Sequence, residues 1–174
     1  MEKVVFLDRD GVINIEKNYL YKIEDFEFID GVFSSLKYLQ NLGYKLVIIT
    51  NQSGIGRGYY SFKQYEILTT WIKEQFKKND IKIEDIFCCP HEPTDDCDCR
   101  KPQIGMITQA SKIIDIDYQN SWVIGDKDSD IQTAINSNIA NTIQVLSGHK
   151  FDKEKSKATH IINSVKDIPT IIKS

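Results

Sequence analysis

Residues 4–14 form an apolar run that ends at two acidic residues, Val4-Val5-Phe6-Leu7-Asp8-Arg9-Asp10-Gly11-Val12-Ile13-Asn14. Four consecutive apolar residues predict a buried strand, and Gly11 lets the backbone turn away after it. Residues i and i+2 of a strand face the same side, so Asp8 and Asp10 can point at one site. Two like charges so close repel by about 4 kcal/mol at intermediate dielectric, unless a cation or a proton lies between them. A strand end with two turn-forming aspartates is the alternative, and these residues alone leave both interpretations open.

Length and composition are those of an ordinary globular protein. The 174 residues are 41% hydrophobic and 27% charged, which is enough for one substantial core. The net charge of −3 gives no electrostatic reason to expect a nucleic acid or an anionic membrane as partner. No apolar run approaches the roughly 20 residues of a membrane span, and no signal-peptide pattern precedes the first strand. We therefore expect one cytoplasmic domain over residues 1–174, and a monomer, because no heptad pattern remains unplaced.

Strand and helix patterns alternate along the rest of the chain. Further strands are predicted at residues 45–50, 85–89, 121–125, 141–146 and 160–162, and helices at residues 32–42, 62–76, 104–114, from 131 onward and at 167–172. Ser61 and Gln64 form a capping box at the start of the second helix. This alternation predicts an α/β fold with one doubly wound, mostly parallel sheet and helices on both faces. No insertion is long enough to form a large cap domain.

Polar side chains follow three of these strands. They are Asp8 and Asp10 after the first strand, Thr50, Asn51 and Ser53 after the second, and Asp126 and Lys127 after the strand at 121–125. Loops at the carboxyl ends of parallel strands form the ligand crevice, so the three clusters should converge. Carboxylates suit Mg²⁺, and lysines such as Lys101 and Lys127 suit a dianionic group beside it. This inventory favours phosphoryl transfer, with one carboxylate attacking phosphorus and another serving as acid and then base.

Asp126 and Asp130 also have a purely structural interpretation. They could be the N-cap and first-turn acid of the next helix, which contribute about 1 kcal/mol each to helix stability. On that interpretation neither residue has a role in chemistry.

Three cysteines and one histidine cluster between residues 89 and 99. Cys89, His91, Cys97 and Cys99 supply the Cys3His donor set of a structural zinc site with no open position. We expect Zn²⁺ to stabilise this zinc loop, residues 89–99, which has no core of its own, with binding energy of order 10 kcal/mol. In a reducing compartment metal ligands or free thiols are expected rather than disulfides, and Cys88 is expected to point into the core. A redox pair, unligated thiols and a nucleic-acid-binding zinc knuckle are the alternatives, and the acidic loop disfavours the last.

The polar motifs, taken together and in order, resemble those of the haloacid dehalogenase-like phosphatases. They are Asp8-x-Asp10-Gly11-Val12-Ile13, Thr50-Asn51, Lys101 and Gly125-Asp126-x-x-x-Asp130, and they span nearly the whole chain. The resemblance implies that Asp8 is the nucleophile that forms an aspartyl-phosphate, and that Asp10 protonates the leaving oxygen and then activates water. It also implies that Thr50 and Lys101 hold the phosphoryl oxygens. Mg²⁺ would be bound by Asp8, the backbone carbonyl of Asp10, and Asp126, with Asp130 behind them.

The zinc loop and the following Arg100-Lys101-Pro102 narrow this resemblance to two branches of the family. The sequence is most similar to phosphatases that remove the 7-phosphate of D-glycero-D-manno-heptose 1,7-bisphosphate in lipopolysaccharide precursor synthesis, with the anomer left open. The alternative branch is the histidinol-phosphate phosphatases of histidine synthesis. The segment TNQSGIGRG at residues 50–58 favours the first branch, and the short spacing from His91 to Cys97 favours the second. A non-catalytic, zinc-dependent interaction module is a remote third possibility, which the complete acidic pair disfavours.

A small sugar bisphosphate as substrate would need a second cationic site. The candidates for it are Arg57, Arg100 and Lys127, although Arg57 could also be a solvated loop residue. The remaining candidate substrate-binding residues are Glu16, Tyr19, Asn51, Gln52 and Ser53. Glu16, Tyr19 and the zinc loop are expected to form the rim of an open crevice.

Overall fold

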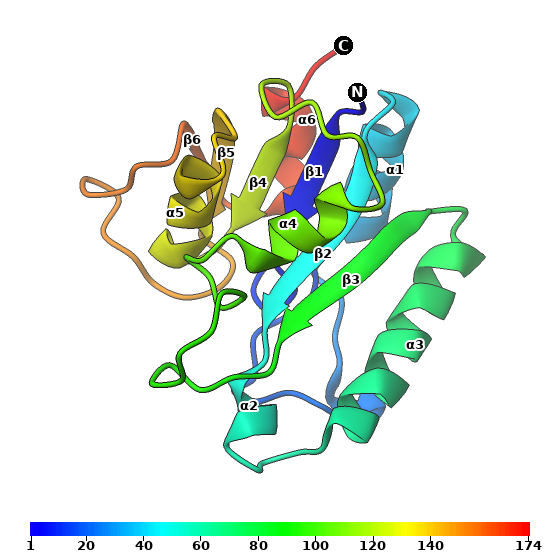
Figure 1. Cartoon of the computed structure of the whole chain (residues 1–174). Coiled ribbons are helices and arrows are strands. Elements are labelled where there is room, and N and C mark those ends of the chain that lie inside the picture. Colours follow the sequence, from blue (N-terminus) through cyan, green and yellow to red (C-terminus); the bar gives the residue numbers. More distant parts are fainter.

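Six parallel strands form one sheet in the computed structural model, which describes residues 1–174. The strands are β1 (Val4–Leu7), β2 (Lys45–Asn51), β3 (Ile83–Cys89), β4 (Trp122–Gly125), β5 (Asn141–Val145) and β6 (His160–Ile162). Their order is β3-β2-β1-β4-β5-β6, and every neighbouring pair is parallel (Figure 1). The chain runs outward from β1 to β3 and then returns to place β4 on the other side of β1. This reversal creates a switch point between β1 and β4, where such folds bind ligands.

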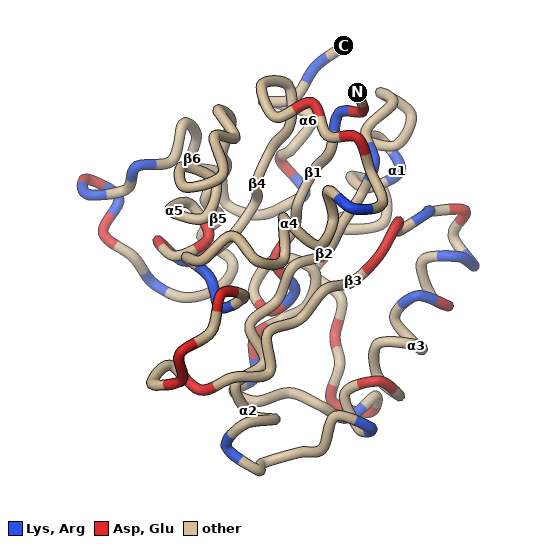
Figure 2. The backbone as a smooth tube through the Cα atoms, viewed as in Figure 1, with Lys and Arg blue, Asp and Glu red and all other residues tan.

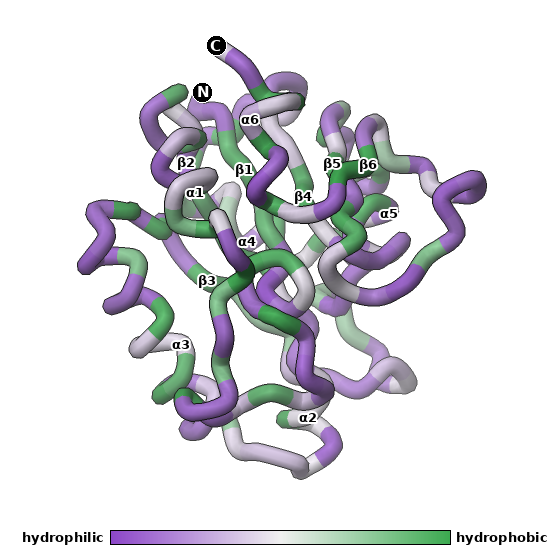
Figure 3. The backbone as a smooth tube through the Cα atoms, turned by 180° about the vertical axis from the view of Figure 1, so that it is seen from behind, coloured by the Kyte–Doolittle hydropathy of each residue, from purple (hydrophilic) through white to green (hydrophobic).

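Helices cover both faces of the sheet, as the sequence predicts. They are α1 (Val32–Asn41), α2 (Ser53–Gly56), α3 (Phe62–Lys78), α4 (Gly105–Ser111), α5 (Asp128–Asn136) and α6 (Ile168–Ile171), with 3-10 turns η1 (Ile23–Asp25) and η2 (Val165–Asp167). Successive side chains of β1 alternate between two cores. Val5 and Leu7 pack in the larger core with α1, α3 and α6, whereas Val4 and Phe6 pack in the smaller core with α4 and α5. Figure 3 shows the hydrophobic residues concentrated in the central strands.

The elements differ from the sequence prediction mainly at their ends. β3 begins at Ile83, two residues earlier than expected, and β2 extends to Asn51. The capping box is present, because the Ser61 hydroxyl accepts a hydrogen bond from the backbone N–H of Gln64 at 3.1 Å. The single-turn α2 is absent from the prediction because two of its four residues are glycines, which are poor helix formers.

The carboxyl ends of the strands and the two chain termini lie on opposite edges of the sheet (Figure 1). α2 and the loop between β3 and α4 lie at the carboxyl edge, and Figure 2 shows acidic residues gathered on that loop. None of the helices is both long and apolar enough to span a membrane.

Candidate active site

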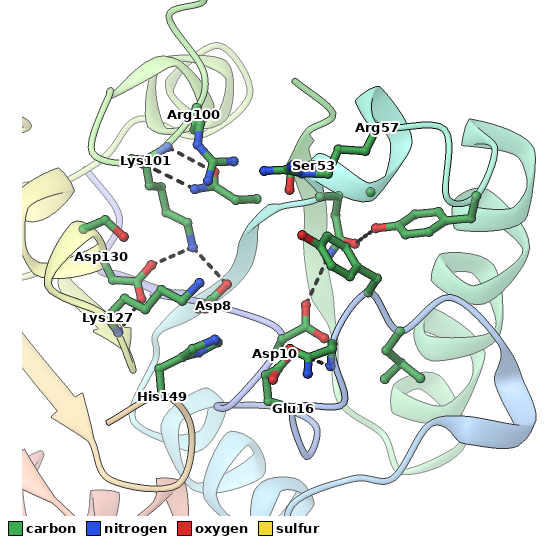
Figure 4. Close-up of a pocket in the computed structure, with 18 residues that line it drawn as sticks. Asp8, Asp10, Glu16, Ser53, Arg57, Arg100, Lys101, Lys127, Asp130 and His149 are labelled. Atoms are coloured by element: carbon green, nitrogen blue, oxygen red, sulfur yellow. Dashed lines mark hydrogen bonds and ion pairs between the residues drawn. The ribbon is translucent and has the colours of Figure 1, made fainter. Parts of the chain in front are cut away.

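A polar pocket of about 240 Å³ opens at the carboxyl ends of the strands (Figure 4). Only three of its 18 lining residues are hydrophobic, so the pocket suits a highly polar ligand. All eight predicted substrate-binding residues line it: Glu16, Tyr19, Asn51, Gln52, Ser53, Arg57, Arg100 and Lys127. Asp8, Asp10 and Lys101 line it as well, whereas Thr50 and Asp126 lie fully buried beside it. The fold therefore brings the candidates from all three strand ends to one place.

Asp8 and Lys101 form a buried ion pair at the centre of the pocket. The Lys101 ammonium donates to Asp8 Oδ1 at 2.9 Å, to the Ile49 carbonyl at 2.9 Å and to Asp130 Oδ1 at 2.6 Å. Burial alone would lower the pKa of Lys101, but the two carboxylates outweigh it and raise that pKa above its ordinary value. All three ammonium hydrogens are thus engaged, so Lys101 must share one of them to contact a phosphoryl oxygen.

The Asp8 carboxylate has one engaged oxygen and one free oxygen. Oδ1 accepts hydrogen bonds from Lys101 and from the backbone N–H of Arg9 at 2.9 Å. Oδ2 has no hydrogen-bond donor, and Asp8 lines the pocket. Burial raises the pKa of Asp8 well above its usual range, and Lys101 only partly offsets this. Oδ2 is therefore the oxygen available to a nucleophilic role.

Both carboxylate oxygens of Asp10 accept hydrogen bonds from neighbouring side chains. Oδ1 accepts from Arg9 Nη2 and from Asn14 Nδ2, both at 3.0 Å, and Oδ2 accepts from Gln52 Nε2 at 3.0 Å. Burial would raise the pKa of Asp10, but the Arg9 guanidinium and these hydrogen bonds outweigh it and lower the pKa. The carboxylate is consequently held in a defined orientation, and the second lone pair of Oδ2 remains open.

Asp126 is the carboxylate best suited to a metal. It is fully buried, Oδ2 accepts the backbone N–H of His149 at 2.8 Å, and Oδ1 has no partner. Burial and the Asp130 charge raise the pKa of Asp126. Gly11, at φ +87°, passes so close that a Cβ there would lie 2.5 Å from Asp126 Oδ2. An orphaned, charged oxygen in such a place fits a hard divalent cation.

The cluster of carboxylates around Asp126 includes Asp130, which was not predicted as a direct magnesium ligand. Carboxylate oxygens of Asp8, Asp126 and Asp130 lie within 4.8 Å of one another. Asp130 has both oxygens in use, one on Lys101 and the other on the backbone N–H of Lys127 at 3.1 Å. Asp130 thus holds Lys101 in place rather than offering a free ligand atom, which agrees with its expected place behind the metal ligands.

Residues at the end of β2 hold a neighbouring backbone segment in place as well as side chains. The Asn51 side chain accepts the backbone N–H of Lys101 at 3.0 Å and donates to the Lys101 carbonyl at 3.3 Å. Gln52 Nε2 donates to Thr50 Oγ1 at 2.8 Å. Asn51 therefore holds the segment that carries Lys101, a task that the sequence did not reveal.

The four predicted zinc ligands converge on one point. Cys89 Sγ lies 3.4 Å from His91 Nδ1 and 3.8 Å from Cys97 Sγ, and His91 Nδ1 lies 3.2 Å from Cys99 Sγ. Cys89 Sγ and Cys99 Sγ are 3.0 Å apart. The edge of a tetrahedron with Zn–S bonds of about 2.3 Å is about 3.8 Å, so the donor set suits a four-coordinate zinc once the closest sulfur pair separates by about 0.8 Å. Cys88 is not part of this group. It is half-buried and belongs to neither core cluster, whereas the sequence predicted that it would point into the core.

Cationic groups lie on two sides of the pocket. Figure 4 shows Arg57 and Arg100 across the pocket from Lys127 and His149. Arg100 Nη1 is buried without a hydrogen-bond partner, and Arg57 is exposed. An unpartnered guanidinium N–H beside a polar pocket is a ready site for an anionic oxygen.

Among the pocket residues that the sequence analysis did not predict, two make side-chain hydrogen bonds to predicted site residues. His149 Nδ1 lies 2.7 Å from Asp126 Oδ2, and Tyr60 donates to Gln52 Oε1 at 2.5 Å. His149 lies in the loop after β5, four residues beyond Val145, so a wider search of the loops after the strands would have included it. Tyr60 lies in a loop with no comparable signal.

The fold and this site together define a phosphatase of the haloacid dehalogenase-like type, with two aspartates after the first strand. The sequence profile of the family described as polynucleotide kinase 3 phosphatase matches residues 3–161, and the chain belongs to this family. A D-glycero-alpha-D-manno-heptose-1,7-bisphosphate 7-phosphatase from Photorhabdus laumondii is 51% identical over 84% of both chains. The corresponding beta-anomer enzyme from Pasteurella multocida is 41% identical over 99% of this chain and 98% of its own.

A solved structure agrees with these sequence relatives. The D,D-heptose 1,7-bisphosphate phosphatase from B. bronchiseptica, complexed with magnesium and phosphate, has a TM-score of 0.83 and 25% identity. It covers 97% of this chain, and the match spans 96% of that chain. The likeness therefore extends over the whole sheet and its helices.

Proposed function

We propose that the chain is a Mg²⁺-dependent phosphatase that removes the 7-phosphate of D-glycero-D-manno-heptose 1,7-bisphosphate through an aspartyl-phosphate. The observation that carries the substrate class is the second cationic group of Arg57 and Arg100, across the pocket from Lys127 (Figure 4). A bisphosphate uses both cationic groups, whereas histidinol phosphate has no second phosphate for them. The names of the relatives support the same choice over histidinol phosphate.

In the first chemical step Asp8 Oδ2 attacks phosphorus and the bond from phosphorus to the sugar oxygen breaks. Asp10 gives its proton to that oxygen, which leaves as the sugar hydroxyl. The lowered pKa of Asp10 favours its ionised form in the free protein. A dianionic phosphoryl group beside it opposes this charge, so substrate binding favours the protonated form that the step needs.

In the second step Asp10, now ionised, takes a proton from water. The resulting hydroxide attacks phosphorus, releases inorganic phosphate and restores the Asp8 carboxylate. Lys101 and Thr50 stabilise the phosphoryl oxygens in both steps.

Asp8, Asp126 and the backbone carbonyl of Asp10 would hold the magnesium ion. When bound, the ion neutralises charge on the phosphoryl group and on the crowded carboxylates. The orphaned Asp126 Oδ1 is the feature of this structure that such an ion would satisfy.

The test is phosphate release with Mg²⁺ from both anomers of heptose 1,7-bisphosphate and from histidinol phosphate, reported as kcat/KM. We expect a preference for a heptose bisphosphate of about a hundredfold or more, equivalent to about 2.7 kcal/mol in transition-state binding. The anomer hydrolysed faster is the assigned substrate. Asp8→Asn should abolish turnover. A preference for histidinol phosphate would overturn the substrate, and an active Asp8→Asn chain would overturn the mechanism.

A further inference from the structure

A chain of hydrogen bonds leads from Tyr60 to Asp10. The Tyr60 hydroxyl donates to Gln52 Oε1 at 2.5 Å, and Gln52 Nε2 donates to Asp10 Oδ2 at 3.0 Å and to Thr50 Oγ1 at 2.8 Å. Gln52 and Tyr60 are only 3% and 4% exposed. The Gln52 side chain lines the pocket and also makes these three hydrogen bonds within the protein, so it has a structural task besides the predicted contact with substrate.

The orientation of the Gln52 side-chain amide decides whether Asp10 and Thr50 face its N–H donors or its oxygen. With Oε1 on Tyr60, the two amide hydrogens point at Asp10 and Thr50. With the amide turned over, Oε1 would face the Asp10 carboxylate, and two acceptors would meet in a buried place, at a cost of about 1–3 kcal/mol. The Tyr60 hydroxyl satisfies Oε1 in the observed direction. Burial raises the pKa of Tyr60 to about 12, so the hydroxyl remains a donor.

The same orientation of the Gln52 amide also determines the hydrogen bonding of the Thr50 hydroxyl. Because Oγ1 accepts from Gln52, the Thr50 hydroxyl keeps its own hydrogen for another acceptor, such as a phosphoryl oxygen. One amide thus orients an acid-base group and a phosphate-binding hydroxyl together.

Tyr60 itself is held firmly in place. Its ring stacks on Tyr21 with centroids 5.2 Å apart and an interplanar angle of 14°. The ring also lies close against Gly54, since a Cβ at Gly54 would collide with Tyr60 Cε1. The Gln52 backbone is tied in turn to the end of β3, because its N–H donates to the Cys89 carbonyl at 2.7 Å.

We infer that Tyr60 is a positioning residue which, through Gln52, aims the Asp10 carboxyl at the leaving oxygen of the substrate. Asp10 has two other donors, Arg9 and Asn14, but both contact Oδ1. Gln52 is the donor on Oδ2, the oxygen whose remaining lone pair is open for proton transfer. Tyr60 is thus a separate contributor to the rate of proton transfer and makes no direct contact with Asp10.

The experiment measures kcat and KM of the parent chain and of Tyr60→Phe on two esters. One is heptose 1,7-bisphosphate, an alkyl phosphate, and the other is p-nitrophenyl phosphate, an aryl phosphate. p-Nitrophenolate leaves without a proton, whereas a sugar alkoxide needs one. A misoriented Asp10 carboxyl should therefore slow hydrolysis of the alkyl ester more than that of the aryl ester. We expect kcat for the alkyl ester to fall about tenfold, with KM changed less than about twofold, and kcat for the aryl ester to change less than about threefold. In a Gln52→Ala chain the additional Tyr60→Phe change should have no further effect, because the link is already broken.

Tyr38→Phe is the matched control. The Tyr38 hydroxyl donates to the Ile172 carbonyl at 2.9 Å, far from the pocket, so this variant also loses one hydroxyl hydrogen bond. It should lose similar thermal stability and keep kcat on both esters. Equal losses on both esters, an unchanged kcat, or additive losses in the double variant would each overturn the inference.

This inference rests on the proposed phosphatase chemistry, but the two fail differently. If the parent chain hydrolyses histidinol phosphate and not the heptose bisphosphate, the proposed substrate is wrong. The Tyr60 comparison then proceeds with histidinol phosphate, which is also an alkyl ester.

Discussion

Three aspartates of the same pocket have three different surroundings. Asp8 has one oxygen on a lysine and one free, Asp10 has donors on both oxygens, and Asp126 has one oxygen without any partner. Burial raises the pKa of Asp8 and of Asp126, whereas the Arg9 guanidinium and two side-chain amides lower that of Asp10 in spite of burial. The proposed nucleophile, acid-base group and metal ligand thus differ through their neighbours, not through residue type.

At the residue scale, the two arginines across the pocket should determine affinity for a second phosphate. Arg100→Ala and Arg57→Ala should raise KM for a heptose bisphosphate about 10- to 100-fold, because each removes charge-assisted hydrogen bonds worth about 1.5–3 kcal/mol. The effect of Arg100→Ala should be the larger, since Arg100 is less exposed and has a buried N–H without a partner.

The control for these variants is a substrate that lacks the second phosphate. KM for a monophosphate ester should change less than about threefold in both variants, because the interaction lost is with the missing group. Equal increases in KM for both substrates would show that the arginines support the pocket in general and do not recognise the second phosphate.

At the scale of elements, residues 89–101 connect the proposed zinc site to the pocket. This segment begins with Cys89, whose carbonyl accepts from the backbone N–H of Gln52, and it ends with Lys101, whose backbone pairs with Asn51. Apart from Cys89 and Cys99, this segment places few buried apolar side chains in either core. We therefore expect a bound metal to be the main means of ordering it.

Removal of zinc should consequently affect both stability and activity. Cys97→Ser should lower the zinc content, lower Tm and reduce kcat, because Arg100 and Lys101 lose their fixed positions. Metal analysis, thermal denaturation and limited proteolysis of the segment measure these effects. Cys88→Ser is the control, since Cys88 lies outside the cluster, and it should keep its zinc. Stoichiometric zinc and full activity in Cys97→Ser would contradict the assigned ligand set.

At the scale of the whole molecule, the fold concentrates negative charge at its switch point. The loop after β1, the end of β4 and the first turn of α5 bring carboxylate oxygens of Asp8, Asp126 and Asp130 within 4.8 Å of one another. Lys101 contacts Asp8 and Asp130, and the His149 imidazole contacts Asp126. We therefore expect this centre to be destabilising in its fully ionised form and to be stabilised by a bound cation. Stability and metal binding are linked for this reason.

The stability of the metal-free chain should fall as pH rises. The folded pKa values of Asp8 and Asp126 are raised above the unfolded value of about 3.9, so the folded chain holds more protons at higher pH than the unfolded chain does. Their cost is absent below pH about 4, grows from there up to the raised folded pKa values, and is constant above them. Mg²⁺ competes with these protons, so the gain in Tm from Mg²⁺ should be larger at about pH 8 than at about pH 4.5.

Asp126→Asn tests the origin of this effect. It removes a buried charge, so Tm of the metal-free chain should rise, by about 2–4 °C for each kcal/mol gained, while most of the gain from Mg²⁺ disappears. Asp128→Asn is the matched control two residues away: Asp128 is exposed, accepts from Gln144 at 3.0 Å, and its variant should keep the gain. Equal gains from Mg²⁺ at both pH values, or an undiminished gain in Asp126→Asn, would contradict the prediction.

Much of the architecture followed from local patterns. Apolar runs such as Val4–Leu7, alternating with helical spacing, predicted the parallel sheet, because burial on both faces imposes such runs on the chain itself. Polar residues directly after strands located Asp8, Asn51 and Asp126 at one edge, since the carboxyl ends of parallel strands meet there whatever the loops do. The clustering of Cys89, His91, Cys97 and Cys99 was predictable for a similar reason, because all of them lie within one short segment.

The sequence by itself therefore determined the sheet, the strand-end residues of the pocket and the grouping of three cysteines with one histidine, all of which follow from periodicity and spacing along the chain. Tertiary structure alone decided how those residues are connected. The link from Lys101 to Asp8 spans 93 positions, that from Gln52 to Asp10 spans 42, and that from His149 to Asp126 spans 23. Such contacts depend on how distant loops fold over the sheet edge, and their directional hydrogen bonds leave no periodic trace in the sequence. For that reason Tyr60, with no motif of its own, emerged as a positioning residue only in the folded molecule.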